Sequence, residues 1–116
     1  MAGHVIFSRS EPLLGHHISC QATMLDEGLH VLLTGGSRSH IGAVSTCLPG
    51  EEPVTNLLPG HKEHFISGPW AKALADKLNA PACVVCGIHY DNATREDIQA
   101  VMSLTRAFLE QLLRKL

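Results

Sequence analysis

Residues 18–34, with the sequence ISCQATMLDEGLHVLLT, decide the fold class of this chain. Apolar and polar residues alternate from Ile18 to Met24 and again, less strictly, from Leu29 to Thr34, which is the period of half-buried β-strands. Asp26, Glu27 and Gly28 separate the two runs with turn-forming residues. Two strand-like runs joined by so short a turn predict an antiparallel β-hairpin.

Further strand signals flank this hairpin. Residues 5–8 predict an edge strand that leaves through a turn over 11–15. After the hairpin, the glycine-rich stretch 35–39 is expected to be a loop, because paired glycines break a strand pattern. Residues 41–48, rich in small and β-branched side chains, predict another strand. A short extended piece is expected over 54–58.

The second half of the chain alternates between helix and strand signals. A helix is predicted over 69–78, with Ser67 as its N-cap and Pro69 in its first turn. The continuous apolar run 82–88 is typical of a strand covered on both faces. Residues 94–97, with the sequence TRED, resemble a capping box and so predict the beginning of a second helix.

This second helix carries the clearest periodic pattern of the chain. One face, at helical spacing, is formed by Ile98, Val101, Met102, Thr105, Phe108, Leu109, Leu112 and Leu116. Arg114 and Lys115 are placed in its last turn, where they suit the helix dipole. Strands followed by helix, strand and helix predict an α+β fold, a mainly antiparallel sheet with two helices on one face.

Composition and charge limit the class of protein. The 116 residues are 45% hydrophobic and 17% charged, which predicts one folded domain over 1–116 rather than a disordered chain. The formal net charge of −2 does not favour nucleic acid as a partner. The first residues lack the features of a signal peptide, and no apolar run is long enough to cross a bilayer. We therefore expect a cytoplasmic protein without membrane contact.

The four cysteines are expected to be reduced, mostly buried thiols without a metal. Cys83 and Cys86 have the spacing found in many zinc sites, but they lie within a predicted strand. Residues three apart in a strand point to opposite faces, so the two sulfurs could not chelate one ion. We expect no metal site from this pair.

Three clusters of histidine beside glycine or turn residues are candidates for a binding site. They are residues 34–42 (TGGSRSHIG), 59–64 (PGHKEH) and 87–91 (GIHYD). The first could bind an anion through main-chain amides, or it could be an ordinary turn. The second could be part of a metal site or a solvated charged loop, and the third a ligand site or a structural histidine. None has the spacing of a catalytic triad, so no catalytic residues are assigned.

Taken together, these motifs resemble one family. The stretches 29–36 (LHVLLTGG) with 40–42 (HIG), 58–63 (LPGHKE) and 87–89 (GIH) are similar to the LpdD-like small proteins, which accompany UbiD-type decarboxylases of gallate and related aromatic acids. The resemblance runs from about residue 15 to the end. His64 and the Cys83/Cys86 pair depart from the family pattern, and no family role is carried over to them.

The resemblance implies a fold, a cofactor and a site. The fold would be that of the small proteasome-assembly chaperones, which form dimers. The function would be that of a chaperone that holds prenylated FMN, possibly FMN, and delivers it to a UbiD-type decarboxylase, so the chain would be a homodimeric binding protein rather than an enzyme. The cofactor-binding residues carried over are Gly35, Gly36, His40, Gly42, His61, Lys62 and His89.

Two other functions stay open at the level of sequence. The chain could be a non-catalytic accessory subunit that completes a decarboxylase through protein contact, without a cofactor of its own. It could also be a small metal enzyme that uses His61, His64 and His89. Flavin spectra would separate the first from a carrier, and metal analysis would test the second.

Overall fold

The alternating run at the beginning of the chain forms the predicted hairpin. In the computed structural model, which describes residues 3–59 and 64–116, β2 (His16–Leu25) pairs antiparallel with β3 (Gly28–Gly36). The inward-facing Cys20 and Leu33 are register partners, and both are buried. The prediction of a hairpin from residues 18–34 is therefore confirmed.

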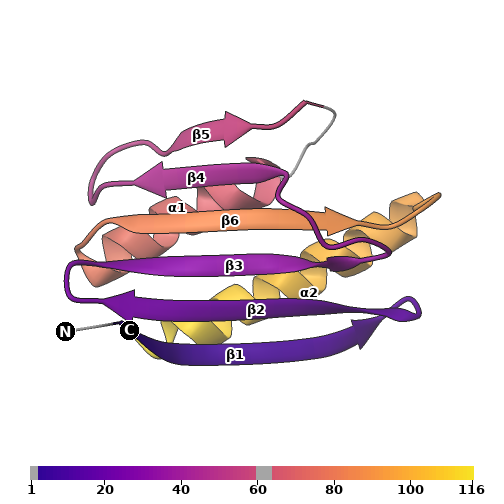
Figure 1. Cartoon of the computed structure of the whole chain (residues 1–116), viewed down its shortest axis with the longest axis horizontal. Coiled ribbons are helices and arrows are strands. Elements are labelled where there is room, and N and C mark those ends of the chain that lie inside the picture. The colour runs from indigo at the N-terminus through magenta and orange to yellow at the C-terminus, as the bar shows by residue number, and fades with distance from the viewer. Residues whose placement is uncertain (1–2, 60–63) are drawn as a thin grey trace.

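Six strands form one sheet in the order β1-β2-β3-β6-β4-β5. β3 and β6 are parallel and the other neighbours are antiparallel, which confirms the mainly antiparallel α+β class. Both helices lie on one side of the sheet, behind it in Figure 1. The remaining elements are β1 (His4–Leu13), β4 (Ala43–Cys47), β5 (Val54–Leu57), α1 (His64–Leu78), β6 (Ala82–His89) and α2 (Arg95–Leu113).

Two strands differ in length from their prediction. β1 continues through Glu11 and Pro12 to Leu13, so the predicted turn over 11–15 is wrong except at its end. Pro12 is tolerated because β1 is an edge strand, where a missing N–H can face solvent. The strand predicted over 41–48 is shorter, at Ala43–Cys47.

The beginning of α1 was predicted incorrectly. The helix begins at His64, five residues before the predicted start, and Ser67 lies inside it rather than at its N-cap. Ser67 is fully buried, and its Oγ shares a 2.7 Å hydrogen bond with Oγ of Ser45 on β4. The same Ser45 oxygen is 2.7 Å from Oγ1 of Thr55 on β5. Ser45 therefore satisfies the Ser67 hydroxyl, which the sequence analysis expected to cap the helix.

Among the described residues, helices cover one face of the sheet and leave the other open. Ala82, Val84 and Cys86 of β6 face the helices and are buried, whereas Cys83 and Val85 are half-buried on the opposite, uncovered face. The prediction that 82–88 is covered on both faces is wrong, because both helices pack on the same side. The opposite directions predicted for Cys83 and Cys86 are confirmed.

α2 begins with the predicted capping box. Thr94 Oγ1 accepts a hydrogen bond from the Asp97 amide, and the Asp97 carboxylate accepts one from the Thr94 amide. Phe108 on its inner face is buried and meets the ring of Phe7 edge-on, with 6.4 Å between centroids.

The ends of α2 correct two details of the prediction. Ile98, included in the predicted face, lies in the first turn and is 54% exposed. Arg114 is the C-cap and Lys115 follows it, so neither lies in the last turn. Neither α2 nor any other helix among the described residues has the length and hydropathy needed to cross a membrane.

Candidate functional site

Two of the three motif segments meet at the end of the parallel strand pair. β3 and β6 run in the same direction, so their carboxyl ends lie side by side, and Gly36 is the register partner of His89. The Ser37 amide donates a 2.6 Å hydrogen bond to the His89 carbonyl oxygen. Residues more than fifty positions apart in the sequence thus form one end of the sheet, on the right in Figure 1.

The glycines at this end allow the main chains to approach closely. Gly35 and Gly36 belong to β3. The loop predicted over 35–39 therefore begins at Ser37, two residues later than predicted. Gly36 has φ +85°, and an added Cβ would overlap the carbonyl oxygen of His89. A Cβ on Gly35 would overlap the carbonyl oxygen of His17. Both glycines are therefore required by main-chain packing, whatever they contribute to a ligand.

His40 and Gly42 bring the segment before β4 to the same place. The His40 carbonyl lies so close to Gly87 that a side chain there would overlap it. The His40 imidazole is half-exposed, with Nδ1 3.3 Å from the Arg38 carbonyl oxygen. The Gly42 amide donates to the Cys86 carbonyl at 2.9 Å. The structure therefore places Gly35, Gly36, His40, Gly42 and His89 together.

His89 has a partner that the sequence analysis did not identify. Its Nε2 lies 3.0 Å from Oδ1 of Asp91, an ion pair when the imidazole is protonated. The Asp91 amide in turn donates to Oγ of Ser37 at 3.2 Å. The His89 side chain is 41% exposed, so a ligand can reach it. In the sequence, the signal for this pair was a histidine and an aspartate two residues apart at the end of a predicted strand.

The second motif segment is described only at its edges. The Leu58 amide donates to the Gly42 carbonyl oxygen at 2.9 Å, so the chain leaves β5 at this same end of the sheet. The predicted site residues His61 and Lys62 fall within 60–63 and lie outside the described residues. The side chain of His64 is likewise not described.

The cysteines are distributed as single thiols. Burial raises the pKa of Cys20 to about 12 and also raises the pKa of Cys83. Such thiols are protonated at neutral pH and are poor metal ligands. Within residues 3–59 and 64–116, His, Cys, Asp and Glu side chains form no group of three that could hold a metal ion.

The six-stranded sheet with two helices on one face is a fold that this chain shares with a solved structure. The crystal structure of a chaperone complex for yeast 20S proteasome assembly matches with a TM-score of 0.67, covering 99% of this chain and 98% of the other. At 13% sequence identity, this likeness concerns the fold alone. The chain belongs to the family of prenylated flavin chaperone LpdD-like domains, whose model matches residues 13–116. Protein LpdD of Lactiplantibacillus plantarum is 28% identical over 104 residues, 85% of this chain and 76% of that protein.

Proposed function

We propose that this chain binds prenylated FMN and delivers it to a UbiD-type aromatic-acid decarboxylase, without catalysing a reaction itself. The observation that carries the proposal is the meeting of Gly36, His40 and His89 at one end of the sheet, in a member of a flavin-chaperone family. A carrier needs a site that is accessible and formed from few contacts, because it must release its cargo.

The chemistry of the cofactor suggests which part of it each of the candidate residues contacts. FMN carries a phosphate dianion at one end and a wide apolar ring system at the other. We assign the phosphate to Lys62 and His40 with neighbouring main-chain amides, because cations and N–H groups are the usual phosphate donors. His61 and His89 are assigned to the polar edge of the ring. For His89 the free donor or acceptor is Nδ1, because Nε2 is engaged by Asp91.

Replacing Lys62 by alanine should weaken binding of reduced prenylated FMN roughly 10- to 150-fold, the loss of one charge-assisted contact. His89→Ala should weaken it by roughly two- to tenfold, as expected for one neutral hydrogen bond. The measurement is an anaerobic titration followed by flavin absorbance and fluorescence. His4→Ala is the matched control, because His4 is an exposed histidine at the opposite end of the sheet.

Three results would contradict this assignment. Equal affinities in all variants would remove Lys62 and His89 from the site. Activation of a UbiD-type decarboxylase by a wild-type chain that binds no flavin would favour the accessory subunit acting by protein contact. One stoichiometric metal per chain, lost on mutation of His61 or His89, would favour the metal enzyme.

We also propose that two copies of the chain associate. β1 and β5 are the edges of the sheet and present main-chain groups that no neighbouring strand of the sheet pairs. Covering such edges across a two-fold axis is a common solution for small domains. Light scattering at micromolar concentration should give about twice the 12.5 kDa mass of one chain. A particle with the mass of a single chain would contradict the homodimer.

A further inference from the structure

A hollow lies on the sheet, away from the end that carries the histidines and glycines. It has a volume of about 400 Å³ and is lined by the beginnings of β3 and β6, the end of β4 and the loop after it. Since β3 rises about 3.3 Å per residue, Gly28 and Gly36 at its two ends are roughly 25 Å apart. The hollow is therefore separate from the proposed flavin site.

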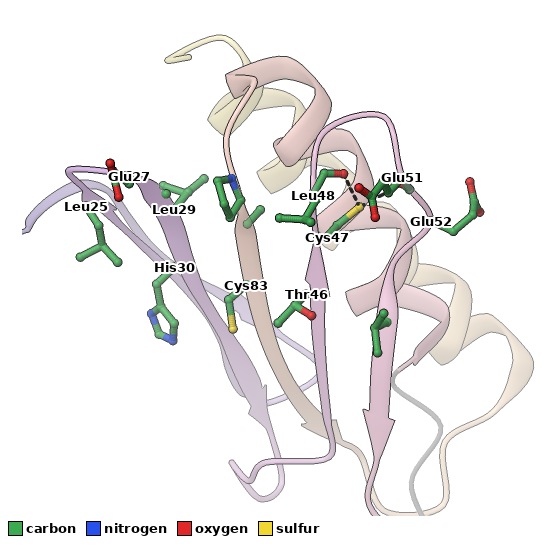
Figure 2. Close-up of a pocket in the computed structure, with 14 residues that line it drawn as sticks. Leu25, Glu27, Leu29, His30, Thr46, Cys47, Leu48, Glu51, Glu52 and Cys83 are labelled. Atoms are coloured by element: carbon green, nitrogen blue, oxygen red, sulfur yellow. Dashed lines mark hydrogen bonds between the residues drawn. The ribbon is translucent and has the colours of Figure 1, made fainter.

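The floor of the hollow is formed by side chains on the uncovered face of the sheet. His30, Cys83 and Thr46 are register partners on three neighbouring strands, and Figure 2 shows all three pointing the same way from the sheet. Gly28 and Ala82 also line the hollow beside them. The hollow is open because neither helix of the described chain covers this face.

One wall is the loop between β4 and β5, and α1 holds it in place. The Cys47 thiol donates to the Leu48 and Glu51 carbonyl oxygens at 3.4 and 3.2 Å. Lys72 of α1 donates to the same Glu51 oxygen at 3.0 Å.

The Gly50 amide donates to the Asp76 carboxylate of α1 at 2.8 Å, and this hydrogen bond is the main cause of the lowered pKa of Asp76. On the opposite side of the hollow, the beginnings of β3 and β6 are joined by a hydrogen bond. The Leu29 amide donates to the Pro81 carbonyl oxygen at 3.0 Å. Both walls are therefore positioned before any ligand arrives.

The lining is apolar with a negative rim. Leu25, Leu48 and Val54 line it while remaining 47%, 49% and 72% exposed. Its charged residues are Glu27, Glu51 and Glu52, and no lysine or arginine of the described chain lines it. Among the ion pairs of the described residues, the Glu52 carboxylate is the one of the three that pairs with a cation, Lys72 at 3.6 Å. An exposed apolar patch with a charged rim is typical of a protein contact.

We propose that this hollow is a docking site for a segment of a partner protein that carries an apolar side chain flanked by lysine or arginine. The apolar side chain would fill the space over Cys83, between His30 and Thr46. The flanking cations would face Glu27 on one side and Glu51 on the other, an arrangement that charge complementarity favours. Nucleic acids and anionic membranes would be repelled by the same carboxylates.

Cys83 is a natural reporter of this docking, because the other three thiols are buried. The probe is a capped peptide with two leucines between two lysines. It should slow alkylation of Cys83 by a maleimide in proportion to its occupancy, and shift the amide NMR signals of His30 and Cys83. Glu27→Gln and Glu51→Gln should each weaken its binding roughly two- to fivefold. Glu11→Gln, an exposed carboxylate at the far end of β1, should not.

Three outcomes would overturn the proposal. The first is equal protection of Cys83 by the same peptide with glutamates in place of the lysines, since charge would then not select the ligand. The second is an unchanged peptide affinity in both glutamine variants. The third is protection of Cys83 without peptide that increases with protein concentration, because a second copy of this chain would then cover the hollow. His89→Ala should leave peptide binding intact, which keeps this test independent of flavin binding.

Discussion

Gly36→Ala should lower the free energy of unfolding by about 3 kcal/mol or more, the combined effect of backbone strain and a main-chain overlap. Gly36 has φ +85°, a conformation that alanine adopts at a cost. The added Cβ would also overlap the His89 carbonyl oxygen, which is main chain and cannot rotate away. Relief would require β3 and β6 to separate at their ends, breaking the hydrogen bond from the Ser37 amide to His89.

Gly15→Ala is the matched control for this prediction. Gly15 has nearly the same φ, +80°, but its Cβ would meet nothing within 4 Å. It should cost only the backbone strain, about 1–2 kcal/mol. Chemical denaturation followed by circular dichroism measures both values. If the two variants lose equal stability, the close approach of β3 and β6 at Gly36 does not contribute, and the geometry described for the site end is wrong.

Phe108→Ala should cost about 3–5 kcal/mol of stability, the usual result of removing a buried aromatic ring. Phe108 is 1% exposed, lies on the inner face of α2 and packs edge-on against Phe7 of β1. Its removal would leave a cavity between the helix and the first strands. Because domains of this size are stable by only about 5–15 kcal/mol, the variant would be only marginally folded at elevated temperature.

Ile98→Ala provides the comparison on the same helix. Ile98 belongs to the same periodic pattern but is 54% exposed, so its replacement should change stability by less than about 0.5 kcal/mol. Thermal melts of the two variants would measure the difference. Similar losses for both would mean that α2 packs on the sheet along its whole length, contrary to the exposure of its first turn.

The elements that the sequence predicted best are those formed by local interactions. The hairpin of β2 and β3 needs only alternating residues and a short turn, and all of its determinants lie within residues 16–36. α2 likewise carries its own start signal, because Thr94 and Asp97 cap each other within one turn. Both could be predicted because the partners are neighbours in the sequence.

The errors occurred where a distant partner decided the local structure. Ser67 has the residue type of a helix cap, but it lies inside α1, where Ser45 of β4 satisfies its hydroxyl. The apolar run 82–88 is typical of a strand covered on both faces, yet the helices cover only one. Pro12 was expected in a turn, but it lies in the edge strand β1, where its register partner is His17 of β2.

For the candidate site, the sequence determined the residues and the tertiary structure determined their grouping. The motifs at Gly35, His40 and His89 were visible as glycine and histidine beside turn residues. Their meeting depends on the parallel pairing of β3 with β6, two strands separated by α1, β4 and β5. The His89–Asp91 pair and the packing of Gly87 under His40 follow from the same arrangement. Such pairing arises from contacts between residues far apart in the chain, and local propensity carries no information about it.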